Sequence, residues 1–95
     1  MDNSLYKCPV FELFRESQWL SIIKRYNMTP REAEVANMIL KGFSYDKVSK
    51  RLEIQPGTVK VHLRTIYGKV QVKNKSALLL KFMDYVNRAS TNPSV

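Results

Sequence analysis

The segment from residue 55 onward reads Gln55-Pro56-Gly57-Thr58-Val59-Lys60-Val61-His62-Leu63-Arg64-Thr65-Ile66-Tyr67-Gly68-Lys69-Val70. Four of its apolar residues recur at steps of four, three and four, the spacing of one face of an α-helix. They are Val59, Leu63, Ile66 and Val70. Because proline suits the first helical position, we predict a helix from Pro56 to about Val70. Lys60, Val61 and Arg64 then share its outer face.

A second helix is expected directly before this one. Ser44 can cap a helix from Tyr45 to Leu52, because its hydroxyl accepts a backbone N–H that a helix start leaves unpaired. Glu53 to Gln55 is a tight connection, in which we expect Ile54 to point into the core. Two helices joined by a turn of this length form a helix-turn-helix, here across residues 45–70.

Further helix signals lie on both sides of this pair. Thr29-Pro30-Arg31-Glu32 combines a capping threonine, an early proline and a glutamate at the capping-box position, so a helix begins there and should stop at Gly42. Asn74 can cap a last helix from Lys75 to about Asn87. No segment shows sustained strand alternation, so we predict an all-α fold.

One more helix, with a broad apolar band, is predicted from near Pro9 to near Tyr26. The chain then divides into an N-terminal helical extension, residues 1–27, a helix-turn-helix domain of four helices, residues 28–88, and a disordered tail, residues 89–95. The tail is rich in Ser, Thr, Asn and Pro.

The two outermost helices carry more apolar surface than one small core needs. Phe14 and Trp19 give the N-terminal helix too much aromatic surface for a solvent-exposed extension. Either this helix packs across the four-helix domain, or it contacts another molecule. In the last helix, Leu80 and Met83 remain available for a second surface, so we expect a homodimer.

The charge of the chain is positive and unevenly distributed. Its net charge is +8 at pH 7, and residues 44–81 hold nine Lys or Arg residues against Asp46 and Glu53. Such a focused field favours nucleic acid as the partner, with an anionic membrane as the second candidate. The basic residues cluster on the helix-turn-helix and not beside the most apolar helix, which argues against the membrane.

Composition excludes several functions. Cys8 is the single cysteine and His62 the single histidine, so there is no internal disulfide and no set of metal ligands. No carboxylates are paired at catalytic spacing, and we expect no enzyme activity and no cofactor. No apolar run approaches the length of a membrane span, and the N-terminus does not resemble a secretory signal. A cytoplasmic protein without membrane contact is expected, with Cys8 inert.

Several motifs occur in a fixed order and spacing. They are Met28-Thr29-Pro30-Arg31-Glu32-Ala33-Glu34-Val35, Gly42-Phe43-Ser44, Lys50-Arg51-Leu52, Ile54, Thr58-Val59-Lys60-Val61-His62 and Val72-Lys73-Asn74-Lys75-Ser76. This pattern, from residue 28 to residue 83, resembles the LuxR/GerE-type DNA-binding domain of bacterial transcription regulators, especially response regulators of the NarL type. The resemblance implies four helices, of which the third enters the DNA major groove and the fourth often forms the dimer contact.

The resemblance also implies roles for individual residues. Base contacts would come from Lys60, Val61 and Arg64, and the chemistry agrees: lysine and arginine donate to guanine O6 and N7, and valine packs on a thymine methyl. A basic face that is merely solvated is the simpler alternative. Thr58, Lys69 and Lys75 would contact phosphates, which set affinity and register rather than sequence preference.

Two candidate phosphate contacts could serve the fold instead. His62 could touch a phosphate or pack beside Ile66, and Thr58 could make only local hydrogen bonds at the helix start. The sequence also departs from the family pattern. Gln55 replaces the usual Ser or Thr cap, and Gln71 replaces a common glycine at the helix end, so both ends of the helix should be weakly anchored.

We predict a sequence-specific transcription regulator that binds as a dimer to half-sites about one helical turn apart. Two alternatives remain open. Pro56-Gly57-Thr58-Val59-Lys60 also resembles region 4 of sigma factors, a polymerase-associated module, although such a region does not need the motif at residues 72–76 and the helix after it. The aromatic N-terminal helix could instead make the protein an interaction module that sequesters a partner protein.

Overall fold

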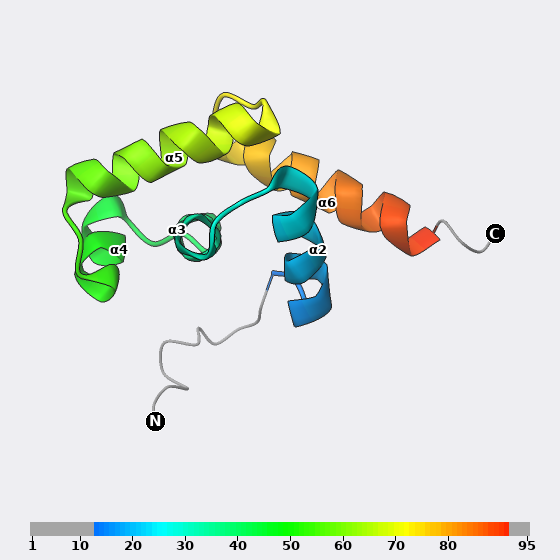
Figure 1. Ribbon diagram of the computed structural model, residues 1–95, viewed down its shortest axis with the longest axis horizontal. Helices are drawn as coiled ribbons and strands as arrows, with labels where there is room; N and C mark the ends of the chain where they lie inside the picture. The colour runs from blue at the N-terminus through cyan, green and yellow to red at the C-terminus, as the bar shows by residue number, and fades with distance from the viewer. Residues whose placement is uncertain (1–12, 92–95) are drawn as a thin grey trace.

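The computed structural model describes residues 13–91, which form five α-helices. Residues 1–12 and 92–95 lie outside the described residues, and the expectations for Cys8 and Pro9 fall there. The helices are α2 (Glu16–Tyr26), α3 (Pro30–Leu40), α4 (Tyr45–Leu52), α5 (Pro56–Val70) and α6 (Lys75–Thr91), as labelled in Figure 1. Residues 13–91 contain no strand, and the predicted all-α class is confirmed.

The helix-turn-helix forms at the predicted residues, because its signals are local. α4 and α5 have the predicted bounds. The Lys47 N–H donates to Ser44 Oγ at 3.1 Å, which is the capping bond that starts α4. Glu53 makes the turn with a left-handed φ of 59°, and Ile54 packs against the core as expected.

α3 begins with the predicted capping box. The Glu32 N–H donates to Thr29 Oγ1 at 3.1 Å, and the Thr29 N–H donates to Glu32 Oε1 at 3.0 Å. The helix ends at Leu40, and Gly42 follows with a φ of 99°, a conformation that glycine adopts without strain. In Figure 1, α3 is seen end-on below α5, between α4 and α2.

α6 is longer than predicted. The Ala77 N–H donates to Asn74 Oδ1 at 2.8 Å, so the helix starts with the expected cap. It then continues to Thr91 instead of ending near Asn87, because each added residue gains one helical hydrogen bond once the helix is formed. The first three residues of the predicted tail, 89–91, are therefore helical.

α2 begins later than predicted. It starts at Glu16 rather than near Pro9, and residues 13–15 lead into it without being helical. The Arg15 backbone is extended, with a ψ of 164°, and its N–H donates to Gln18 Oε1 at 2.8 Å. This bond at the first turn marks where the helix starts.

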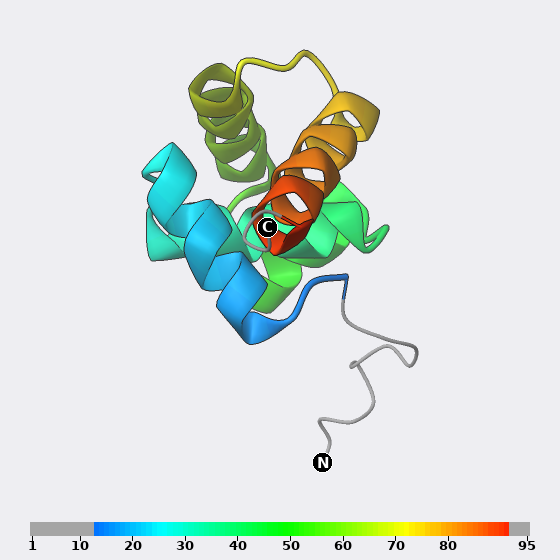
Figure 2. The same ribbon diagram turned by 90° about the vertical axis from the view of Figure 1, so that its right-hand side faces the viewer.

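An aromatic cluster holds α2 against α6. The Phe82 ring of α6 lies 6.3 Å from Phe14, 5.8 Å from Trp19 and 5.8 Å from Tyr26, measured between ring centroids. Phe14 is only 6% exposed although it precedes the helix. Its burial against α6 explains the late start of α2, since the chain bends to bring this ring into the core. Figure 2 shows α2 and α6 side by side.

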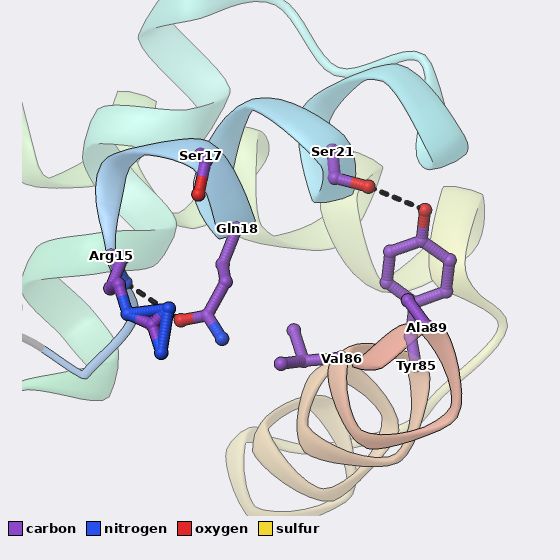
Figure 3. A pocket seen from close by; sticks show the side chains of 7 residues that line it. All are labelled: Arg15, Ser17, Gln18, Ser21, Tyr85, Val86 and Ala89. Atoms are coloured by element: carbon purple, nitrogen blue, oxygen red, sulfur yellow. Dashed lines mark hydrogen bonds between the residues drawn. The ribbon is translucent and has the colours of Figure 1, made fainter. Parts of the chain in front are cut away.

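A polar contact accompanies these rings. The Ser21 hydroxyl of α2 and the Tyr85 hydroxyl of α6 lie 2.6 Å apart, as Figure 3 shows. Of the two alternatives for the N-terminal helix, the structure therefore has the packing within one chain. Every helix contributes to a single buried core, whose members are Phe14, Ile22, Met28, Val35, Ala36, Ile39, Val48, Val59, Leu63, Ile66, Val70, Leu78, Phe82 and Val86.

Candidate nucleic-acid interface

α5 presents an exposed face with positive charge. Lys60 and Arg64 are exposed, and Val61 is 54% exposed although it is apolar. Gly57 and Gly68 have open space where a Cβ atom would stand. Among the side chains that the structure describes, neither Lys60 nor Arg64 has a carboxylate partner. We call Lys60, Val61 and Arg64 the reading face.

The opposite side of α5 is buried and fixes the direction of the reading face. Its stripe consists of Val59, Leu63, Ile66 and Val70, each at most 2% exposed. These are the four residues predicted from the spacing. Because these four side chains are packed in the core, α5 cannot rotate about its axis without disrupting the core packing, so the reading face keeps its orientation.

The start of α5 is held by backbone bonds alone. The Gln55 side chain makes no capping hydrogen bond, as its departure from the family pattern predicts. The Thr58 N–H donates to the Gln55 carbonyl at 2.9 Å, and the Val59 N–H donates to the same oxygen at 3.1 Å. The Thr58 amide is thus used inside the chain, which leaves the hydroxyl as the group that can meet an anion.

Lys69 is engaged inside the chain. Its Nζ donates to Glu32 Oε1 at 2.7 Å and to the Asn27 carbonyl at 2.8 Å, which ties α5 to the connection between α2 and α3. The lysine side chain is 28% exposed and the glutamate side chain 8% exposed. Sequence reasoning missed this pair because 37 residues separate its members and each fits a local role without the other.

Electrostatics around Glu32 favour its charged form. Burial alone would raise the pKa of Glu32. The hydrogen bonds from Lys69 and from the Thr29 N–H, together with the charges of Lys69 and His62, lower it by more, so the net pKa lies below the ordinary value. His62 is half-buried. The influence of His62 is the smallest of these effects on Glu32.

A basic group on α4 was also missed. Lys47 Nζ lies 5.7 Å and the Arg51 guanidinium 5.1 Å from the centre of the Phe43 ring. The signal was present in the sequence, because residues 43, 47 and 51 follow one another at steps of four.

Three other predicted site residues lie on α6. Lys75 is exposed at the first residue of the helix. Leu80 is 64% exposed and Met83 is 44% exposed. The two apolar residues are three positions apart, so they share one side of the helix.

Comparison with known proteins agrees with this geometry. The family model for bacterial regulatory proteins of the luxR family matches residues 26–82. The chain belongs to the luxR family. The match covers α3, α4 and α5 and the first part of α6, so α2 is an addition in front of the family domain. The predicted family and the predicted architecture are both confirmed.

Curated relatives of this luxR-family chain are transcription regulators. It is 31% identical over 83 residues to the HTH-type transcriptional regulator MalT of Yersinia enterocolitica, and 30% identical over 83 residues to MalT of Yersinia pestis. Both alignments cover 81% of this chain but 9% of the relative, so the chain corresponds to a small part of those proteins. No solved structure matches the chain significantly.

At the level of the family, these findings support DNA-binding transcription regulation, and the family is one of regulatory proteins rather than of enzymes. Residues 13–91 contain no helix that is both long and apolar enough to cross a membrane. Over the described part of the chain, no three His, Cys, Asp or Glu side chains gather as ligands of a metal ion would.

Proposed function

We propose that the chain recognises particular sequences in double-stranded DNA by inserting α5 into the major groove. The observation that carries this proposal is the reading face, whose two cations are exposed and lack partners in the described part of the chain. An α-helix fits the major groove, where Lys60 and Arg64 donate to guanine and Val61 packs on a thymine methyl. Membership of the luxR family supports regulation of transcription, in the cytoplasm of a bacterium.

Four further residues are proposed to contact phosphates: Thr58, His62, Lys69 and Lys75. Lys75 is exposed, and Thr58 keeps its hydroxyl for this contact. Lys69 uses two of its three N–H donors on Glu32 and Asn27, so one donor remains for DNA.

We propose that the protein binds as a homodimer through Leu80 and Met83. What supports this is their exposure on the same side of α6, since exposed apolar side chains gain free energy when a second copy covers them. Two such copies would occupy half-sites about one helical turn apart. The alternatives have less support: the family match favours a luxR-type regulator over a sigma-factor module, and Phe14 and Trp19 are occupied within the chain instead of being free for a partner protein.

Selection of bound duplexes from a random pool at low salt tests the proposal. We expect a short enriched motif, repeated with two-fold symmetry if the protein dimerises on DNA. A matched control is Arg88→Ala, which removes an exposed arginine paired with Asp84 on α6 and should enrich the same motif. A folded protein that enriches no duplex over scrambled sequence refutes sequence-specific binding.

A further inference from the structure

A groove of about 480 Å³ lies beside α5, between the α3–α4 and α5–α6 connections. Its polar lining consists of Ser44, Tyr45, Tyr67, Lys73, Asn74 and Lys75, and no carboxylate lines it. Among the described side chains, neither lysine is in an ion pair. The groove therefore carries two positive charges that nothing in the described chain neutralises.

Two phenols add neutral donors to these charges. Burial raises the pKa of the Tyr67 hydroxyl, and the neighbouring Tyr45 phenol raises it further. Both phenols line the groove, and the raised pKa keeps the Tyr67 proton on its oxygen near neutral pH. A tetrahedral anion has several acceptor oxygens, so it is the class of ligand that lysine ammonium groups and phenol O–H groups can bind together.

The groove lies next to the reading face. Tyr67 follows Lys60 by seven residues and Arg64 by three, so the three side chains share one side of α5. On the other side of α5, the charge of Lys69 is offset by Glu32. The groove therefore adds positive charge without a carboxylate partner beside the side of α5 that carries Lys60 and Arg64.

We propose that this groove holds a backbone phosphate of one DNA strand, bound by Lys73, Lys75 and the hydroxyls of Tyr45 and Tyr67. This inference rests on the proposed function, because the phosphate belongs to the duplex whose major groove α5 enters. A phosphate bound in this protein groove would fix the rotation of α5 within the DNA major groove. It would also make the protein contact one DNA strand more strongly than the other.

The test uses Lys73→Ala and Tyr67→Phe in the full chain, with DNA affinity measured over a range of salt concentrations. We expect Lys73→Ala to weaken cognate and random duplexes alike and to reduce the slope of log affinity against log salt by about one. Tyr67→Phe keeps the ring and removes the hydroxyl, so we expect a roughly threefold to tenfold loss for both duplexes. Lys24→Ala, on the exposed side of α2, should change neither quantity.

A duplex with one phosphate replaced by a neutral methylphosphonate locates the contact. At one position of one strand, the replacement should weaken the wild type but cause no further loss in Lys73→Ala. If the wild type binds DNA while both groove variants bind as it does, or if every replacement weakens Lys73→Ala as much as the wild type, the groove proposal is wrong and the proposed function stands. If the wild type binds no duplex, the proposed function itself fails.

Discussion

The reading face of α5 and the junction between α2 and α6 are built on opposite principles. At the junction, the rings of Phe14, Trp19 and Phe82 cover one another, and the Ser21 and Tyr85 hydroxyls are paired. On the reading face, the cations have no internal partner in the described chain and an apolar side chain is left in solvent. The junction buries its rings within the chain, whereas the reading face leaves its side chains exposed to solvent.

This difference separates two kinds of mutational effect. Removing a side chain at the junction should lower the free energy of unfolding and leave DNA recognition by the folded fraction intact. Removing a side chain from the reading face should weaken DNA recognition and leave the free energy of unfolding nearly unchanged, because exposed side chains without internal contacts contribute little to folding. Substitutions in each region, and at the place where the two regions meet, test this separation.

The largest expected effect is at the junction. Phe82→Ala removes a fully buried ring that contacts three others, and we expect a loss of about 3–5 kcal/mol in the free energy of unfolding, from lost burial and from the cavity left behind. Urea unfolding followed by circular dichroism measures it. Leu20→Ala is the control, because Leu20 lies on α2 but is 60% exposed. Equal losses for both variants would mean that α2 is not held by the aromatic cluster.

On the reading face, Arg64→Ala should cost about 1–3 kcal/mol of binding to the selected duplex and relax the preference at one base pair. Its unfolding free energy should change by less than about 0.5 kcal/mol, because the side chain is exposed. Titration of cognate and random duplexes, with Arg88→Ala alongside, provides the measurement. An equal loss on both duplexes would move Arg64 from base contact to phosphate contact.

Lys69 lies where the two regions meet, since it joins α5 to the end of α2 and the start of α3. Lys69→Met leaves the buried Glu32 carboxylate without its cation, and we expect a loss of about 1–3 kcal/mol in unfolding free energy near pH 7. Glu32→Gln in the same variant should recover most of this loss, because it removes the unpaired charge and keeps the capping-box hydrogen bond. If Glu32→Gln recovers none of the lost unfolding free energy, the unpaired Glu32 charge is not the cause of the loss.

The stability of Lys69→Met relative to the wild type should depend on pH in a defined direction. In the wild type the pKa of Glu32 is lowered, so its contribution to stability is present above the ordinary carboxyl value of 4.5 and is lost as the pH falls through the lower folded value. In Lys69→Met, burial dominates and raises the pKa, so protonation relieves the variant. The difference between wild type and variant should therefore shrink between pH 7 and pH 4, and a constant difference would contradict this origin.

The parts of the fold that the sequence predicted are those with local signals. α3, α4 and α5 start at capping residues and prolines that act within four residues, and α5 has a regular buried stripe. The start of α2 was misplaced because Phe14 fits a helical apolar band equally well, and its partner Phe82 is 68 positions away in the chain. Only tertiary packing decides between a helix and a bend there.

The same distinction holds for the candidate site. Exposure of the reading face followed from the spacing of the buried stripe, and so it was predictable. The partners of Lys69 were not, because Glu32 and Asn27 come from another part of the chain. The groove has the same origin: Tyr45 and Tyr67 line it together because α4 and α5 pack against each other and against the start of α6.

The smallest expected effect is at the C-terminal end of α5. Gln71 ends it with a left-handed φ of 64°, a conformation in which a side chain crowds the backbone. Gln71→Gly should therefore raise the unfolding free energy by about 0.5–1 kcal/mol. The control is Asn27→Gly at the end of α2, where φ is 55° but asparagine already tolerates the conformation, so the gain should be smaller. Equal gains at both sites would mean that strain at Gln71 is not what weakens the end of α5.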